Sequence, residues 1–179
     1  HNLGFSFNNQ NDHRKRFVND IGLKSEMVMN QFEKYDNIGL YLFSSKNIGK
    51  FMFSGGIRYD NNTITLENIL ASSGKISENI KSINPSVNLN YTFKNFDIFS
   101  NISSGYETPT LNELSATTDQ SGFNSDLKSV KSKSFEIGIS NYQKFTKLKY
   151  NIRFFDVRTK NEIIPFESIT GQVIYQNAG

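Results

Sequence analysis

The sequence predicts an all-β fold, a segment of an antiparallel transmembrane β-barrel. The first observation is an alternation of apolar and polar side chains, in which Leu3, Phe5 and Phe7 face one way while Gly4 and Ser6 face the other. Such a period of two is the geometry of a β-strand with one apolar face. The second observation is that short reversals alternate with long polar connections along the chain. That arrangement is typical of barrels with short periplasmic turns and long extracellular loops.

The composition favours spanning strands over spanning helices. Only 36% of the 179 residues are hydrophobic, and the mean hydropathy is −0.49. A transmembrane helix needs about 20 consecutive apolar residues, whereas a transmembrane strand needs about 9 to 11 residues with one apolar face. The chain has no cysteine, which excludes disulfides and thiolate chemistry. The net charge of +3 is modest and the basic residues are dispersed, so nucleic acid is not expected as a partner.

The alternation defines about eight strands in order. The first is predicted at 2–9, and a polar loop over 10–34 precedes a second strand marked by Ile38, Leu40 and Leu42. Further strands are predicted at 51–60, 83–93, 97–105, 132–142, 148–157 and 173–179. Tight reversals are expected at Lys46-Asn47, at Lys94-Asn95 and near Lys144. The first residues open directly in a strand pattern with no signal peptide, so we expect the chain to begin within a longer protein.

Two other architectures share this periodicity. A soluble β-sandwich binding module would bury the apolar faces of Phe53, Leu89 and Ile137 against a second sheet. A complete small barrel of eight strands, with a structural or adhesion role, is also compatible with the length of the chain. An enzyme is not expected, because the only histidines are His1 and His13 and there is no G-x-S-x-G motif.

Several segments carry a more specific signal. They are SGGIRYD at 54–60, NPSV at 84–87, ISSGYETPTLNEL at 102–114, GFNSDLK at 122–128, SKSFEIG at 132–138 and YQNAG at 175–179. Together, and in this order, they resemble the barrel of TonB-dependent outer-membrane receptors. The chain departs from that pattern at Glu107-Thr108, where the family often carries Arg-Ala, and at Ser125, where it often carries proline.

The resemblance implies a bacterial outer-membrane receptor that imports an iron chelate, of the siderophore or ferric citrate type. It implies that residues 1–179 are part of a barrel domain of about 22 strands, with a plug domain and the other strands outside this segment. Energy would come from the TonB complex through upstream segments. Outer-membrane lipid is the expected surrounding, with no cofactor and no bound metal. Haem receptors of this family carry a histidine in the segment that corresponds to 109–127, and this chain has none there.

The candidate ligand-binding residues lie in predicted loops. The basic run Arg14, Lys15 and Arg16 in the first long loop could attract an anionic chelate or a lipopolysaccharide phosphate, although a solvated loop tip has the same composition. Tyr106 and Glu107 precede the proline motif and could contact a chelate from the lumen, although tyrosine is also common at the membrane interface. Pro109 is expected to mark the end of a strand.

Overall fold

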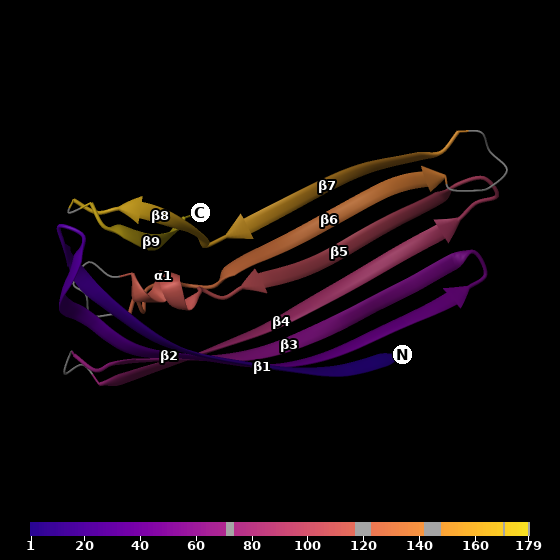
Figure 1. The fold of residues 1–179 in the computed structure, drawn as a ribbon. Helices are drawn as coiled ribbons and strands as arrows, with labels where there is room; N and C mark the ends of the chain where they lie inside the picture. The colour runs from indigo at the N-terminus through magenta and orange to yellow at the C-terminus, as the bar shows by residue number, and fades with distance from the viewer. Residues whose placement is uncertain (71–73, 117–122, 142–147, 170, 179) are drawn as a thin grey trace.

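The computed structural model consists of one long, curved antiparallel sheet with a small second sheet over one end (Figure 1). It describes residues 1–179 except 71–73, 117–122, 142–147, 170 and 179. The strands of the large sheet are β1 (Asn2–Asp20), β2 (Leu23–Ile48), β3 (Phe51–Asn68), β4 (Lys75–Thr92), β5 (Asp97–Glu107), β6 (Val130–Asn141) and β7 (Tyr150–Lys160). The small sheet pairs β8 (Glu162–Glu167) with β9 (Val173–Ala178), and α1 (Leu111–Ser115) is a single short helix. No described helix is long and apolar enough to cross a membrane.

The large sheet is an open barrel wall. Its strands lie in sequence order, each antiparallel to the next, and β1 and β7 are its two edges. Phe53, Leu89 and Ile137 are 45%, 36% and 43% exposed on its convex side, where no second sheet covers them. The β-sandwich alternative is therefore wrong. Because β1 does not pair with β7, the described residues do not form a closed small barrel either.

The first two strands are much longer than the sequence indicated. The segment 10–34, predicted as a loop, instead continues β1 and β2 as a ladder up to a tight turn at Ile21 and Gly22. Both turn residues have positive φ, 46° and 86°, as a two-residue hairpin with the twist of its strands requires. The polar composition was misleading because both faces of a strand can be polar where it stands beyond the membrane.

The turns that follow β2 and β4 are at the opposite end of the sheet, which we call the turn end. The β2–β3 reversal lies at Gly49 and Lys50 and not at Lys46-Asn47, because Gly49 has the positive φ of 60° that the turn needs. The β4–β5 reversal at Lys94-Asn95 is confirmed, with the amide of Phe93 donating to the carbonyl of Phe96 at 2.8 Å. The turn predicted near Lys144 lies outside the described residues.

The other end of the sheet, the loop end, holds α1, β8, β9 and the β1–β2 turn (Figure 1). Here the segment predicted as an eighth wall strand behaves differently. β9 does not pair with β7 but with β8, in a register that places Glu162 opposite Ala178. The wall therefore has seven described strands, and the last two form a separate hairpin.

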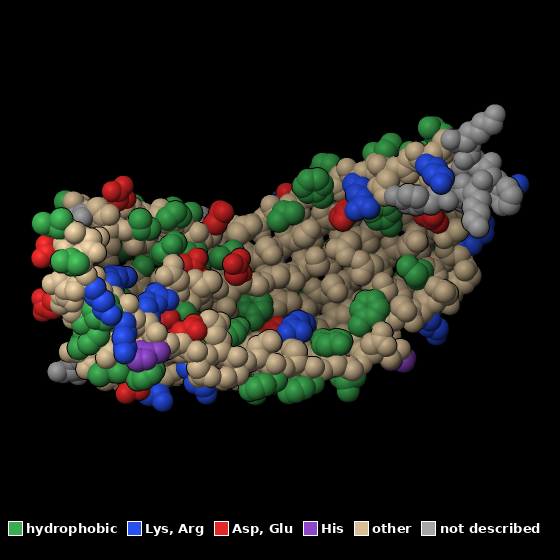
Figure 2. All heavy atoms as spheres, viewed as in Figure 1, with side chains coloured by type: hydrophobic (Ala, Val, Ile, Leu, Met, Phe, Trp, Pro, Cys, Tyr) green, Lys and Arg blue, Asp and Glu red, His purple; other side chains and the backbone are tan. Residues whose placement is uncertain are grey.

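An apolar band covers the convex face next to the turn end. On β3 the outward side chains are apolar from Phe51 to Tyr59, a stretch that matches the about 9 to 11 residues of a tilted membrane-spanning strand. Phe51, Tyr91 and Phe93 contact one another edge to face beside the short turns, with ring centroids 4.5 Å apart in both pairs. Aromatic side chains at this level are typical of the girdle at a membrane interface. The concave face is lined largely by uncharged polar side chains and backbone (Figure 2).

Beyond this band the amphipathic pattern inverts. Past Tyr59 the outward side chains of β3 are polar, while Ile64 and Leu66 point inward and are 1% and 3% exposed. β4 shows the same inversion between inward Ile80 and outward Ile83. Lipid covers apolar groups on the outside and water covers polar ones, so the inversion marks where the wall leaves the membrane.

Candidate functional site

The inner face at the loop end carries a small hydrophobic core. Its buried members come from β3, from α1 and from the connection between α1 and β6: Ile64, Leu66, Leu111, Leu114, Phe123 and Leu127. Ile163 of β8 and Tyr175 of β9 pack against them. This core folds the predicted loop inward against the wall. Sequence reasoning missed it, although the spacing of Leu111 and Leu114 on one helical turn and the inverted pattern of β3 were both visible.

A capping box fixes the start of α1. The backbone amide of Thr110 donates to Glu113 Oε2 at 2.7 Å, and the backbone amide of Glu113 donates to Thr110 Oγ1 at 3.3 Å. Two amides that the helix cannot satisfy are thereby bonded. The strand before it ends at Glu107, just before Pro109, which confirms the predicted strand end. The helix thus begins directly beside the end of β5.

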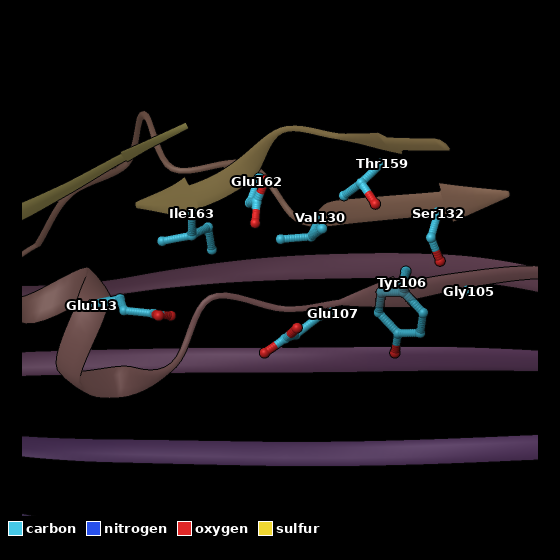
Figure 3. Close-up of a pocket in the computed structure, with 9 residues that line it drawn as sticks. All are labelled: Gly105, Tyr106, Glu107, Glu113, Val130, Ser132, Thr159, Glu162 and Ile163. Carbon is cyan, nitrogen blue, oxygen red and sulfur yellow. The ribbon is translucent and has the colours of Figure 1, made fainter. Parts of the chain in front are cut away.

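Tyr106 and Glu107, two of the predicted ligand-binding residues, line one cavity of about 460 Å³ between β5, α1, β6, β7 and β8, which we call the mouth cavity (Figure 3). Glu113 projects into this mouth cavity from α1 and Glu162 from β8 (Figure 3). The complete lining is Gly105, Tyr106, Glu107, Glu113, Val130, Ser132, Thr159, Glu162 and Ile163. Three carboxylates and no Lys or Arg side chain line it, so its field favours neutral or cationic groups. No described cluster of three or more His, Cys, Asp or Glu is arranged to hold a metal ion.

Asn62 on β3 holds Tyr106 in place. The Asn62 side-chain amide donates to Tyr106 Oη at 2.7 Å and to the carbonyl oxygen of Ile80 at 3.3 Å. Its Oδ1 accepts from the Tyr35 hydroxyl at 2.6 Å and from Asn37 Nδ2 at 2.8 Å. Asn62 is fully buried, and all its hydrogen-bonding capacity is used. One asparagine therefore joins β2, β3, β4 and the end of β5, a role that sequence reasoning did not identify.

A second polar link crosses the inner face beside it. The guanidinium of Arg58 contacts Asp60 Oδ1 at 2.6 Å and donates to Ser6 Oγ at 3.0 Å on β1. To reach β1, the Arg58 side chain passes over Gly39 of β2, where an added Cβ would collide with Arg58 and Ser6. A larger residue at this position would have to displace the ends of the Arg58 and Ser6 side chains, and so would disturb the link between them.

The structure separates the three basic residues that the sequence grouped together. Arg14 faces inward, where its Nη2 contacts Glu33 Oε2 at 2.9 Å. Its Nη1 donates to Ser115 Oγ at 2.7 Å and to Asn112 Oδ1 at 3.1 Å, so it joins β1 and β2 to α1. Lys15, the next residue of the strand, faces the opposite side and is exposed.

Arg16 is exposed and pairs with Met29 near the loop end of β1. The basic run therefore does not form one patch with Tyr106 and Glu107. Arg14 instead lines a second cavity of about 370 Å³, together with Tyr35, Pro109 and other residues of the segment before α1. Ligand contact by the three basic residues stays a prediction.

Burial perturbs the acidic partner of Arg14. The Glu33 side chain is 0% exposed. Burial raises the pKa of the Glu33 carboxyl above its usual range, and the charge of Arg14 opposes this shift only in part. Gln31 Nε2 also donates to Glu33 Oε1 at 2.8 Å. Arg14 and Glu33 therefore form an ion pair in which the carboxylate is fully buried, so that loss of Arg14 would leave a buried group without its counter-charge.

These features define a class of protein. A curved wall with an apolar band outside, a polar inner face and an inward-folded loop segment at one end is the wall of a large transmembrane β-barrel. The model of the family described as "TonB dependent receptor-like, beta-barrel" matches residues 1–179. The chain belongs to this family, whose barrels lie in the outer membrane of Gram-negative bacteria.

Solved structures agree on the fold. The FrpB iron transporter from Neisseria meningitidis is similar with a TM-score of 0.66 and 17% identity, over 99% of this chain and 28% of that one. The copper transporter OprC is similar with a TM-score of 0.72 and 10% identity, over 98% and 29%. The alcaligin outer-membrane receptor FauA from Bordetella pertussis has a TM-score of 0.60 and 15% identity, over 98% and 30%. The chain thus spans less than a third of the length of these proteins, and the family is one of receptors and transporters rather than enzymes.

Proposed function

We propose that the whole protein imports a bulky metal chelate, of the iron–siderophore type, through the barrel to which this wall belongs. The observation that carries the proposal is the family match over residues 1–179. The polar mouth cavity with Tyr106 and Glu107 supports it, because a chelate entering from outside meets the loop end first. FrpB and FauA, which share the fold, are described as an iron transporter and an alcaligin receptor.

Transport through such a wall requires further parts of the protein. A barrel of about 22 strands has a lumen wide enough to leak unless a plug fills it. We propose that the plug domain, the remaining strands and the segment that contacts the TonB complex lie outside residues 1–179. The inner face of the described wall, with its small and uncharged polar side chains, would border that plug.

The charge of the mouth cavity bears on the kind of chelate. Glu107, Glu113 and Glu162 line it without a compensating Lys or Arg. We propose that neutral or cationic chelates are preferred over anionic ones such as ferric citrate, because like charges lower the local concentration of a ligand.

Uptake of radiolabelled iron tests the proposal in a strain that lacks the chromosomal gene and carries the full-length protein on a plasmid. With a panel of ferric chelates of differing charge, we expect uptake that requires both the receptor and an intact TonB system. Glu107→Gln is expected to change the apparent KM for the transported chelate about three- to tenfold, the size of one hydrogen bond or charge contact.

Glu67→Gln is the matched control for this variant. Glu67 is a carboxylate on the outward face of β3, away from the mouth cavity, so its removal should leave uptake unchanged. Uptake that persists without the TonB system would contradict the energised mechanism. If no chelate is taken up but copper sensitivity depends on the receptor, the cargo is a metal ion and not an iron chelate.

A further inference from the structure

A group of cations lies on the convex face just beyond the apolar band. On β6, Lys131 and Lys133 share the outward side of the strand with Phe135 and Ile137 and lie nearer the loop end. Lys133 is directly opposite Arg158 in the ladder with β7, so both share this face. Lys81 is the first outward residue of β4 beyond Ile83. We call Lys81, Lys131, Lys133 and Arg158 the outer cation cluster.

A crevice in the wall brings three of these cations together. β4 and β5 pair only between Ser86–Thr92 and Asp97–Ser103, and beyond these residues they diverge toward the loop end (Figure 1). The opening is a crevice of about 280 Å³. Its lining includes Lys81, Lys131, Lys133 and Tyr106, several serines, and no carboxylate. The crevice is therefore a gap in the barrel wall, and the three lysines border it from the outward side of β4 and β6.

The charges in the outer cation cluster are poorly compensated by the protein itself. None of its three lysines forms an ion pair within the part of the chain that the structure describes. Arg158 contacts Asp156 at 2.9 Å, but both side chains are largely exposed. Like charges directly opposite on neighbouring strands are destabilising, as Lys133 and Arg158 are here. An anion bound from outside would relieve this repulsion.

We propose that the outer cation cluster binds the phosphate of an anionic lipid headgroup in the outer leaflet of the membrane. The cluster lies at the level where the apolar band ends, which is where headgroups meet a barrel wall. Clustered Lys and Arg at this level attract anionic headgroups, and ammonium–phosphate hydrogen bonds are strong because both partners are charged. The acyl chains of the same lipid would cover Ile83, Phe135 and Ile137 directly below. The inference does not depend on the identity of the transported cargo.

Thermal unfolding of the full-length protein in a neutral detergent, followed by heat-modifiable electrophoretic mobility, tests this proposal. The added probes are lipid A, the same glycolipid without its phosphates, and inorganic phosphate. We expect lipid A to raise the unfolding temperature saturably and the other two probes to have little effect. The double variant Lys131→Gln/Lys133→Gln should need at least about tenfold more lipid A for the same shift.

The control removes two lysines from elsewhere on the outward surface. Lys46→Gln/Lys75→Gln alters exposed positions of strands β2 and β4 away from the crevice and should respond to lipid A as the unmodified protein does. The proposal fails if the Lys131/Lys133 variant keeps the full response, or if the control loses as much. It also fails if dephosphorylated glycolipid or inorganic phosphate acts as well as lipid A. Should the double variant not fold, Lys133→Gln alone gives the same comparison with a smaller expected loss.

Discussion

Replacing Arg14 by alanine is expected to lower the free energy of unfolding of the full-length protein by about 3 kcal/mol. Breaking a buried ion pair by removing one partner costs about 3 to 5 kcal/mol, because the other charge is left buried and uncompensated. The lower figure applies because the Arg14 side chain is still 28% exposed, whereas that of Glu33 is fully buried. The same change removes the hydrogen bonds to Asn112 and Ser115, so α1 should loosen from β1.

The pH dependence of this loss identifies its cause. Burial already raises the pKa of Glu33, and removal of Arg14 takes away a charge that lowers it. A carboxyl whose pKa is raised on folding binds more protons in the folded state, so its stability contribution falls as pH rises from its unfolded pKa through its folded one. The deficit of Arg14→Ala should therefore shrink at acidic pH and grow toward neutral pH.

Thermal unfolding at several pH values, followed by electrophoretic mobility, measures this trend. Glu33→Gln mimics the protonated carboxyl, so the double variant Arg14→Ala/Glu33→Gln should be more stable at neutral pH than Arg14→Ala alone. A deficit independent of pH and unchanged by the second substitution would mean that the uncompensated Glu33 charge is not its source.

Leu89→Arg is expected to destabilise the barrel by about 2 to 4 kcal/mol, the cost of a cation on the lipid face near the middle of a transmembrane strand. Leu89 lies opposite Phe53 within the apolar band, and both side chains face outward. In the membrane the new guanidinium would have no water and no counter-charge. Urea-dependent folding into phospholipid bilayers measures the difference in free energy.

Asn88→Arg is the matched control on the same strand. Asn88 faces the inner side and lines a hollow of about 430 Å³ that also contains Glu136 and Arg153, an ion pair at 3.1 Å. The substitution loses the hydrogen bond that Asn88 accepts from Asn101, worth about 1 kcal/mol, but leaves the new charge hydrated. Equal penalties for the two variants would show that the faces of β4 are wrongly assigned.

The presence of the membrane-spanning strands, and which of their side chains face lipid, could be predicted from the local sequence. Within the membrane one face must be apolar, so Val87, Leu89 and Tyr91 stand out against their polar neighbours. Outside the membrane this contrast disappears or inverts. The pairing of β1 with β2 over residues 10–34 was therefore missed, although their backbones pair there up to the turn with register shifts only around Phe17.

The candidate site was predicted in part. Tyr106 and Glu107 lie in the mouth cavity because a strand that ends before Pro109 must deliver its last residues to the loop end. The run at 14–16 suggested one basic patch, but period-two geometry places Arg14 and Lys15 on opposite faces. Alternation predicts that separation once the segment is known to be a strand.

The sequence by itself determined the barrel class, the lipid-facing side chains and the family, because the membrane imposes a pattern that each strand shows independently. Only the tertiary structure decided which distant groups meet: Asn62 with Tyr106, Arg14 with Ser115, and the apolar residues of the loop segment with β3. These contacts depend on how the connection after β5 folds back into the barrel. No local periodicity encodes that path, because it is fixed by the burial of a few apolar side chains across long separations in the chain.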